Sequence, residues 1–166
     1  MKRIICLVCI MAALSAFCGC SHAAGNYTRP VNVYYCAASV DYRSADGLFA
    51  KEVRDYYGWS ERLLDFLNVY LAGPLKSDLV SPFPAGSKVN SLHTNGTSIN
   101  VQLNASFSGL SSNELTLACA CLSMTVLDIT GAENVNIQIE GLGDGNTNIT
   151  MTRENMHITD LTVPEE

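Results

Sequence analysis

The feature that most restricts how this chain can fold is the dipeptide Asn95-Gly96, which lies between two segments of β-branched, aliphatic and polar residues. Asn-Gly readily adopts positive φ at both central positions of a type I′ turn, so it predicts a tight β-hairpin. The predicted strands are residues 88–94 and 97–104. In the second strand aliphatic and polar residues alternate, so one face should be buried and the other exposed to water.

One helix is predicted on each side of this hairpin. Ser60 can cap a helix whose apolar residues recur at three- and four-residue spacing and which ends before Gly73. Ser111 and Glu114 have the spacing of a capping box, which predicts the start of a second helix over about 112–128.

The second predicted helix is apolar on more than one side. A helix of this kind is either deeply buried or has a partner, and the sequence leaves both alternatives open. The core stripe consists of Leu115, Ala118, Cys119, Leu122, Thr125, Val126 and Ile129. The residues on a different side, which form a possible partner surface, are Leu117, Cys121 and Met124.

Two outer strands complete the expected fold. Residues 31–36 have the composition of a strand, and residues 134–140 alternate apolar and polar side chains. The mixed-charge residues 37–59 predict an exposed connection that can include a short strand at 48–53. The order strand, helix, hairpin, helix, strand predicts an α+β fold: a two-layer sandwich in which two helices cover one face of a small mixed sheet.

The N-terminus has the pattern of a removable export signal. Two basic residues, Lys2 and Arg3, precede an apolar run over 4–17 that is too short for a stable membrane-spanning helix. Cleavage after Gly19 would leave Cys20 as a lipidated N-terminus, and two acyl chains would hold the protein firmly on a membrane. The alternative is ordinary secretion with cleavage near residues 23–24.

This interpretation divides the chain into a signal peptide (1–19), a lipidated tether (20–30), a folded domain (31–142) and a peripheral C-terminal extension (143–166). The protein is then expected on the extracytoplasmic face of the cell membrane. Loss of the signal leaves 8 Lys and Arg against 16 Asp and Glu, a net charge near −8. Such a surface repels phosphate backbones, so nucleic-acid binding is not expected.

Only three of the seven cysteines, Cys36, Cys119 and Cys121, lie in the predicted domain, so at most one internal disulfide can form. On a helix Cys119 and Cys121 point about 200° apart, which does not give a two-ligand metal face. The three residues are either buried thiols or include a bridge from Cys36 to one of the other two. No metal and no cofactor are expected.

Several short motifs follow one another in a specific order. They are Val33–Tyr35, Leu71–Pro74, Phe83–Lys88, Asn100–Asn104, the capped second helix and the strand that ends at Gly141. In this arrangement the chain resembles the GerMN domain of sporulation and spore germination lipoproteins over roughly residues 31–142.

The resemblance implies a non-catalytic, membrane-tethered domain related to the ring-building motifs of sporulation secretion machinery, which assemble protein complexes in the envelope. The expected partners are envelope or sporulation proteins, or further copies of the chain. The family has no catalytic residues to carry over to this sequence.

The residues themselves also argue against an enzyme. The three histidines, His22, His93 and His157, share no predicted element, and no nucleophile motif, paired-histidine metal motif or phosphate-binding loop is present. A second non-enzymatic hypothesis is capture of cell-wall glycan, peptide or another small ligand by aromatic rings. The candidate contacts are Tyr56, Tyr57 and Trp59. The same cluster could instead pack against the start of the first helix.

Overall fold

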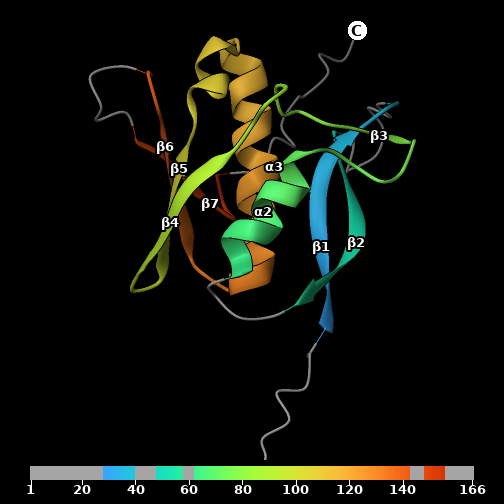
Figure 1. Ribbon diagram of the computed structural model, residues 1–166, viewed down its shortest axis with the longest axis horizontal. Coiled ribbons are helices and arrows are strands. Elements are labelled where there is room, and N and C mark those ends of the chain that lie inside the picture. The colour runs from blue at the N-terminus through green and yellow to red at the C-terminus, as the bar shows by residue number, and fades with distance from the viewer. Residues whose placement is uncertain (1–27, 40–47, 58–61, 143–147, 156–166) are drawn as a thin grey trace, which may run out of the picture.

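The computed structural model describes residues 28–39, 48–57, 62–142 and 148–155. In these residues an α+β fold is built from the following elements, labelled in Figure 1: β1 (Thr28–Ala37), β2 (Phe49–Tyr57), α2 (Leu63–Leu71), β3 (Leu79–Val80), β4 (Val89–Asn95), β5 (Ser98–Leu103), a 3₁₀ helix (Ala105–Gly109), α3 (Ser112–Thr130), β6 (Asn134–Ile139) and β7 (Asn148–Thr152). The predicted fold class is confirmed.

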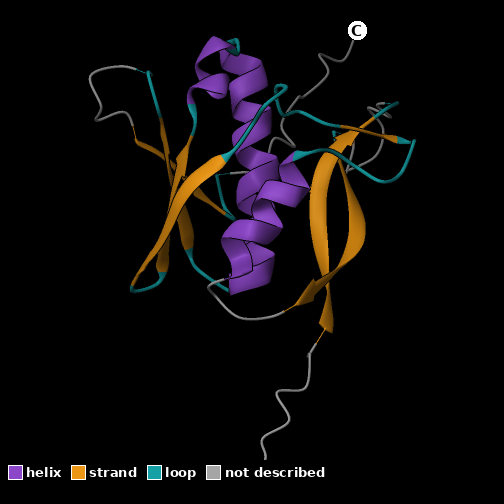
Figure 2. Cartoon of the chain, viewed as in Figure 1, coloured by secondary structure: helices purple, strands orange, loops and turns teal. Residues whose placement is uncertain are grey.

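The strands form two sheets rather than one. The first has the order β2-β1-β3, and the second is a mixed sheet of order β4-β5-β6-β7 in which only β5 and β6 run parallel. The helices lie between the two sheets (Figure 2), and α3 contacts both β1 and β6. The predicted single sheet with both helices on one face is therefore wrong. The reason is that β1 pairs with β2 along one edge, while its other edge contacts β3 and the side chains of Thr125 and Tyr70, so neither edge is open to the hairpin.

The hairpin is present, but its turn differs from the prediction by one residue. Asn95 pairs with Ser98, which leaves Gly96 and Thr97 as the central residues. Gly96 has φ +60°, whereas no non-glycine residue in the described part of the chain has positive φ. Positive φ at the first central position alone is the φ pattern of a type II′ turn, so the predicted type I′ turn is wrong.

The start of α3 is the capping box that the sequence predicts. The Ser111 side chain accepts a hydrogen bond from the Glu114 backbone N–H, and the Glu114 carboxylate accepts one from the Ser111 backbone N–H at 2.9 Å. The helix ends at Gly131, whose φ of +70° is a left-handed conformation that glycine adopts without strain. Ser60, the predicted cap of the first helix, lies outside the described residues. In the structure α2 begins at Leu63.

Part of the C-terminal extension is described and contains a strand. Residues 148–152 form β7, which pairs antiparallel with β6 and extends the second sheet. Ile149 and Met151 of this strand pack against the core.

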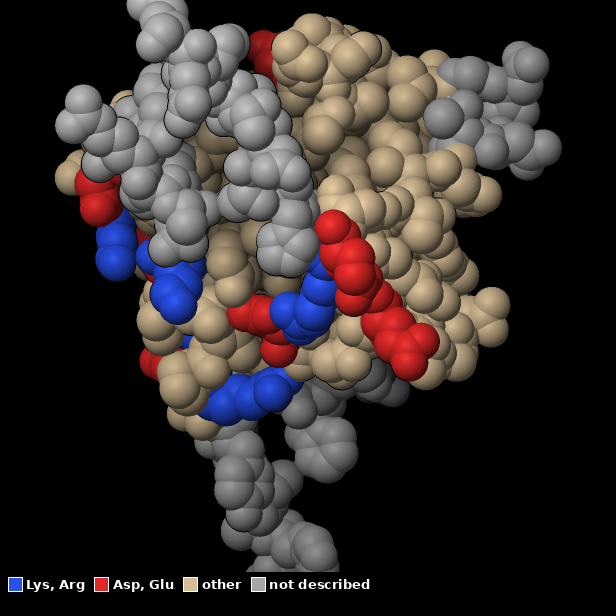
Figure 3. All heavy atoms as spheres, turned by 180° about the vertical axis from the view of Figure 1, so that it is seen from behind, with Lys and Arg blue, Asp and Glu red and all other residues tan. Residues whose placement is uncertain are grey.

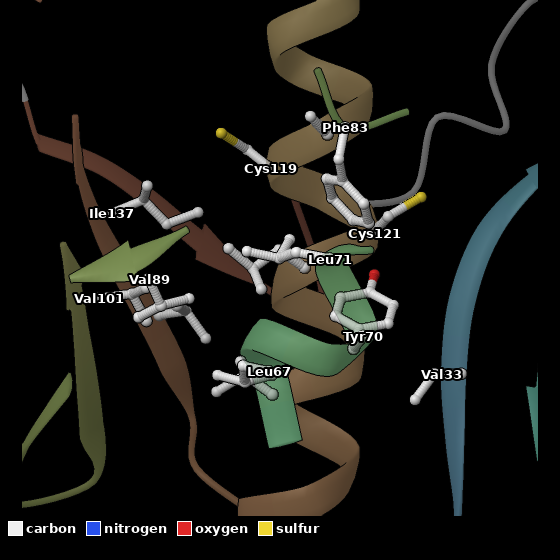
Figure 4. Packing of buried hydrophobic residues seen from close by; sticks show 14 of the residues in the cluster. Val33, Leu67, Tyr70, Leu71, Phe83, Val89, Val101, Cys119, Cys121 and Ile137 are labelled. Atoms are coloured by element: carbon white, nitrogen blue, oxygen red, sulfur yellow. The ribbon is translucent and has the colours of Figure 1, made fainter. Parts of the chain in front are cut away.

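The core lies on both sides of α3. Figure 4 shows Cys119 pointing toward the sheet that carries Val101 and Ile137, and Cys121 pointing toward β1. Above α2, a series of rings continues the core: Tyr35 and Tyr70 have centroids 5.0 Å apart, and Phe83 lies 5.1 Å from Tyr70. The contact between Tyr35 and Tyr70 fixes α2 relative to β1, and so helps to place the surface that β2 and α2 form together.

Candidate functional site

The side of α3 that was predicted as a possible partner surface is largely inside the protein. Cys121 is completely buried, whereas Leu117 and Met124 are half-buried, and Met124 packs against the core. The edge of β1 covers this side of the helix, where the Tyr34 backbone N–H donates to the Thr125 hydroxyl at 3.0 Å. Of the two alternatives that the sequence left open, burial therefore applies to Cys121, and a partner surface that includes Cys121 is wrong.

The two cysteines of α3 have different neighbours. The Cys121 thiol is hydrogen-bonded to the thiol of Cys36 on β1, whereas Cys119 faces the other sheet, where burial raises its pKa to about 12. All three thiols are free in this structure. Geometry thus makes Cys121, and not Cys119, the neighbour of Cys36.

A buried carboxylate joins β2 to the turn that follows α2. Glu52, which is 2% exposed, pairs with Arg54 and accepts hydrogen bonds from the backbone N–H groups of Leu75 (2.9 Å) and Lys76 (3.0 Å). Arg54 also donates to the Gly73 carbonyl at 2.7 Å. Burial acts to raise the pKa of Glu52, but the hydrogen bonds from Arg54 and the two backbone groups bring the pKa below its ordinary value. The role of this cluster is therefore structural, because it holds the turn after α2 against β2.

A second polar cluster lies where β1, α3 and the residues after β7 meet. The Asp128 carboxylate accepts hydrogen bonds from the Tyr34 hydroxyl (2.7 Å), the Asn32 amide (3.3 Å) and Arg153 (3.2 Å). Burial, together with the hydrogen bond to Asp128, raises the pKa of Tyr34 to about 12. Burial acts to raise the pKa of Asp128, but its three donors bring it below the ordinary value. Both carboxylate oxygens of Asp128 therefore already accept hydrogen bonds from protein groups.

The described residues offer no obvious catalytic or metal centre. They contain no group of three or more His, Cys, Asp or Glu side chains placed to hold a metal ion. On the face seen in Figure 3, the coloured Lys, Arg, Asp and Glu side chains are interspersed, and a broad area of that face carries neither sign. The described part of that face therefore presents no large patch of a single charge.

The most distinctive surface feature is a hollow of about 850 Å³ between β2 and α2, called here the β2–α2 groove. Large apolar side chains are unusually exposed in it: Leu75 is 82%, Val69 66%, Val53 61% and Tyr57 52% exposed. Only one other large apolar side chain in the described part of the chain, Val80, is exposed to this degree. The complete lining is Val53, Arg54, Asp55, Tyr56, Tyr57, Arg62, Asp65, Phe66, Val69 and Leu75.

The three aromatic residues predicted as ligand contacts are not equivalent. Tyr56 is 5% exposed and packs edge-on against Phe66 near the start of α2, with ring centroids 5.2 Å apart. Tyr57, the next residue on the strand, points to the other face and is exposed in the groove. Trp59 lies outside the described residues. Packing against the first helix, the alternative interpretation of the cluster, therefore applies to Tyr56.

Sequence reasoning missed the other apolar residues of the groove. Val69 is an apolar residue that falls outside the buried stripe of α2, and Leu75 directly follows the proline that ends the helical pattern. An apolar residue that the periodicity of its element does not explain was the signal that could have identified both.

Comparisons with known proteins agree with this fold. The family model described as "Germane: Sporulation and spore germination" matches residues 33–143, so the chain belongs to this family. No curated protein sequence matches the chain. None of the helices in the described residues is long and apolar enough to cross a membrane.

Two solved structures from Bacillus subtilis share the fold. The tandem GerMN domains of the sporulation protein GerM match with a TM-score of 0.56 and 17% identity, over 80% of this chain and 47% of that one. The first GerMN domain of GerM alone matches with a TM-score of 0.57 and 16% identity, over 76% of this chain and 99% of that one. The present chain thus spans about half of the tandem structure and corresponds to one domain.

Proposed function

We propose that this protein is a lipoprotein, anchored at Cys20 on the extracytoplasmic face of the membrane, whose single GerMN domain holds envelope proteins together during sporulation or spore germination. Membership of the sporulation and germination family supports the biological setting. The observation that carries the assembly role is the β2–α2 groove, because exposed apolar residues gathered in one hollow are typical of a protein-binding surface.

A non-catalytic role fits the chemistry of the described residues. The carboxylates of Glu52 and Asp128 hold structural hydrogen bonds, and the α3 cysteines are buried in the core. A catalytic group must instead reach the substrate and be free to exchange a proton or form a bond.

The position of the lipid anchor would keep the domain close to the membrane. The first described strand begins at Thr28, eight residues after Cys20. A fully extended chain covers about 3.4 Å per residue, so the tether would span at most about 27 Å. Partners would then be proteins whose extracytoplasmic parts lie next to the same membrane.

Crosslinking of the tagged full-length protein in growing and in sporulating cells tests this function. We expect envelope proteins to be captured reproducibly, with the capture lost on Leu75→Lys because the groove loses an exposed apolar contact. Val80→Lys is the matched control, since Val80 is a similarly exposed aliphatic residue outside the groove lining. Equal capture by both variants would rule out the groove as the assembly surface, and Cys20→Ala should release the protein from the membrane.

A second function, capture of cell-wall glycan, peptide or another small ligand, is favoured by one observation. Tyr57 exposes its ring in a hollow whose volume lies in the range of small-molecule sites. Binding of purified wall fragments should then fall on Tyr57→Ala and on Trp59→Ala. Unchanged binding in both variants, or no binding by the wild type, would exclude this function.

A further inference from the structure

The β2–α2 groove runs along the open edge of a β-sheet. β2 is the terminal strand of its sheet, and no described strand pairs with its second edge. Side chains alternate between the two faces of a strand, yet all five consecutive residues 53–57 line the groove. Because residues from both faces of β2 line the hollow, the hollow lies at the edge of this strand. Another strand could add to the sheet at this edge.

The hydrogen bonds of β1 show which main-chain groups point to this edge. The Tyr34 backbone N–H donates to Thr125 and its carbonyl accepts from the Tyr70 hydroxyl at 2.6 Å, so both groups face away from β2. Lys51, which lies opposite Tyr34, is therefore in a non-hydrogen-bonded pair, and its main-chain groups point outward. By alternation along the strand, those of Val53 and Asp55 point outward as well.

The sequence of β2 is complementary to itself when it is reversed about Val53. In an antiparallel pair of two such strands, Lys51 of each copy lies opposite Asp55 of the other, and Phe49 lies opposite Tyr57. Opposite charges and aromatic pairs across a sheet are stabilising, whereas like charges are destabilising. A pair centred on Arg54 or on Asp55 would instead place two identical charges opposite each other.

We propose that β2 pairs antiparallel with the β2 strand of a second copy of this chain, in a two-fold arrangement centred on Val53. The inference rests on the proposed assembly function and specifies one partner of the groove. Lys51 on an open edge discourages pairing with chance strands, because its charge is matched only where a carboxylate lies opposite.

The same arrangement accounts for the exposed apolar residues Val69, on α2, and Leu75, in the turn after α2. The contact between Tyr56 and Phe66 places α2 on the face of the sheet that carries Tyr56. A two-fold axis perpendicular to the sheet puts both copies of α2 on this face, on either side of the axis. Val69 and Leu75, which line the groove beside the edge of β2, then lie next to the incoming copy.

A cysteine at the two-fold axis tests the pairing directly. Opposed residues of a hydrogen-bonded antiparallel pair have Cα atoms about 5.5 Å apart, which a disulfide can bridge. When the full-length Val53→Cys variant is oxidised in cells, we therefore expect a covalent dimer of this chain. The amount of dimer should exceed that of the wild type, which controls for disulfides formed by the native cysteines. Absence of this dimer, or a disulfide from Val53→Cys to a different protein, would overturn the proposal.

The register is tested by two further variants. Lys51→Cys and Asp55→Cys should form a covalent dimer when the two are co-expressed, because each position lies opposite the other. Either variant alone should form no more covalent dimer than the wild type. In such a dimer the two new cysteines would be four residues out of register, about 13 Å apart. Dimers from Lys51→Cys alone would contradict the proposed register.

Reversal of charge provides a test without a crosslink. With two differently tagged full-length copies, Lys51→Asp should reduce co-purification about tenfold, because each new carboxylate faces Asp55 of the partner. Lys51→Asp combined with Asp55→Lys should restore co-purification. Lys88→Asp, at an exposed site directly before β4, should leave it unchanged. If these variants have no effect while envelope proteins are still captured, the dimer is wrong and the assembly function stands.

Discussion

The two helices of this domain use their apolar residues in opposite ways. α3 is apolar on more than one side and suggested a partner surface, yet it lies between two sheets that bury Cys119 and Cys121 on different sides. α2 is shorter and buries one stripe, but it leaves Val69 exposed beside the open edge of β2. The comparison teaches that the number of apolar sides does not identify an interaction surface, because the sheets determine which sides remain uncovered.

The largest effect that this comparison predicts concerns core packing. Leu122 on α3 is completely buried, so Leu122→Ala should lower the free energy of unfolding by about 3 kcal/mol through lost burial and a residual cavity. Val69→Ala on α2 should change it by no more than about 0.5 kcal/mol, because the side chain is exposed. Urea denaturation of both variants measures the difference, and comparable losses would contradict the assignment of α3 as core and Val69 as surface.

The next effect compares buried Glu52, which pairs with the groove residue Arg54, with Asp65 of the groove lining. Glu52→Gln removes the charge that balances buried Arg54 and should cost about 2 kcal/mol of unfolding free energy. Asp65→Asn, at an exposed position of α2 in the same groove, should cost less than about 0.5 kcal/mol. The same denaturation measurement compares them, and a stable Glu52→Gln variant would show that the cluster does not fasten the turn after α2.

Much of the fold could be predicted from local sequence. The capping box at Ser111, the strand at 134–139 and the end of α2 before Gly73 depend on residues close together in the chain, and each is confirmed. The pairing of β1 was not predictable in this way. Residues 49–57 carry charges that obscure their alternation, so the strand that pairs with β1 was predicted only in part.

The candidate site could be predicted less well, for the same physical reason. Tyr57 was identified as an exposed aromatic residue, but its neighbours Val69 and Leu75 join it only through the packing of α2 against β2. For Cys121 the sequence left burial and a partner surface open, because periodicity shows that a side of a helix is apolar without showing what covers it. Which apolar residues stay exposed is a property of the tertiary structure.

A smaller effect is expected at the start of α3. Ser111→Ala removes the side-chain acceptor for the Glu114 backbone N–H and should lower the unfolding free energy by about 1 kcal/mol. Ser111→Asp should largely retain stability, because aspartate is also a good cap. Urea denaturation of the two variants separates capping from other roles of the hydroxyl group, since a general role would make both substitutions equally harmful.

The smallest effect is a pH dependence that arises at the end of α3 rather than in the groove. The pKa of Asp128 in the folded protein lies below its ordinary value, because the donors Tyr34, Asn32 and Arg153 outweigh the effect of burial. A carboxylate with a lowered folded pKa stabilises the protein above its unfolded pKa of about 4, and this stability is lost as pH falls through the folded value. Tyr34→Phe removes one donor, so it should reduce the loss of stability between about pH 5 and pH 2.

Urea titrations at several pH values measure the slope of unfolding free energy against pH. An unchanged slope in Tyr34→Phe would mean that the hydrogen bond to Asp128 does not set the pKa of Asp128. The groove variant Val69→Ala should keep the wild-type slope, because none of the four residues of this hydrogen-bond cluster is part of the groove lining.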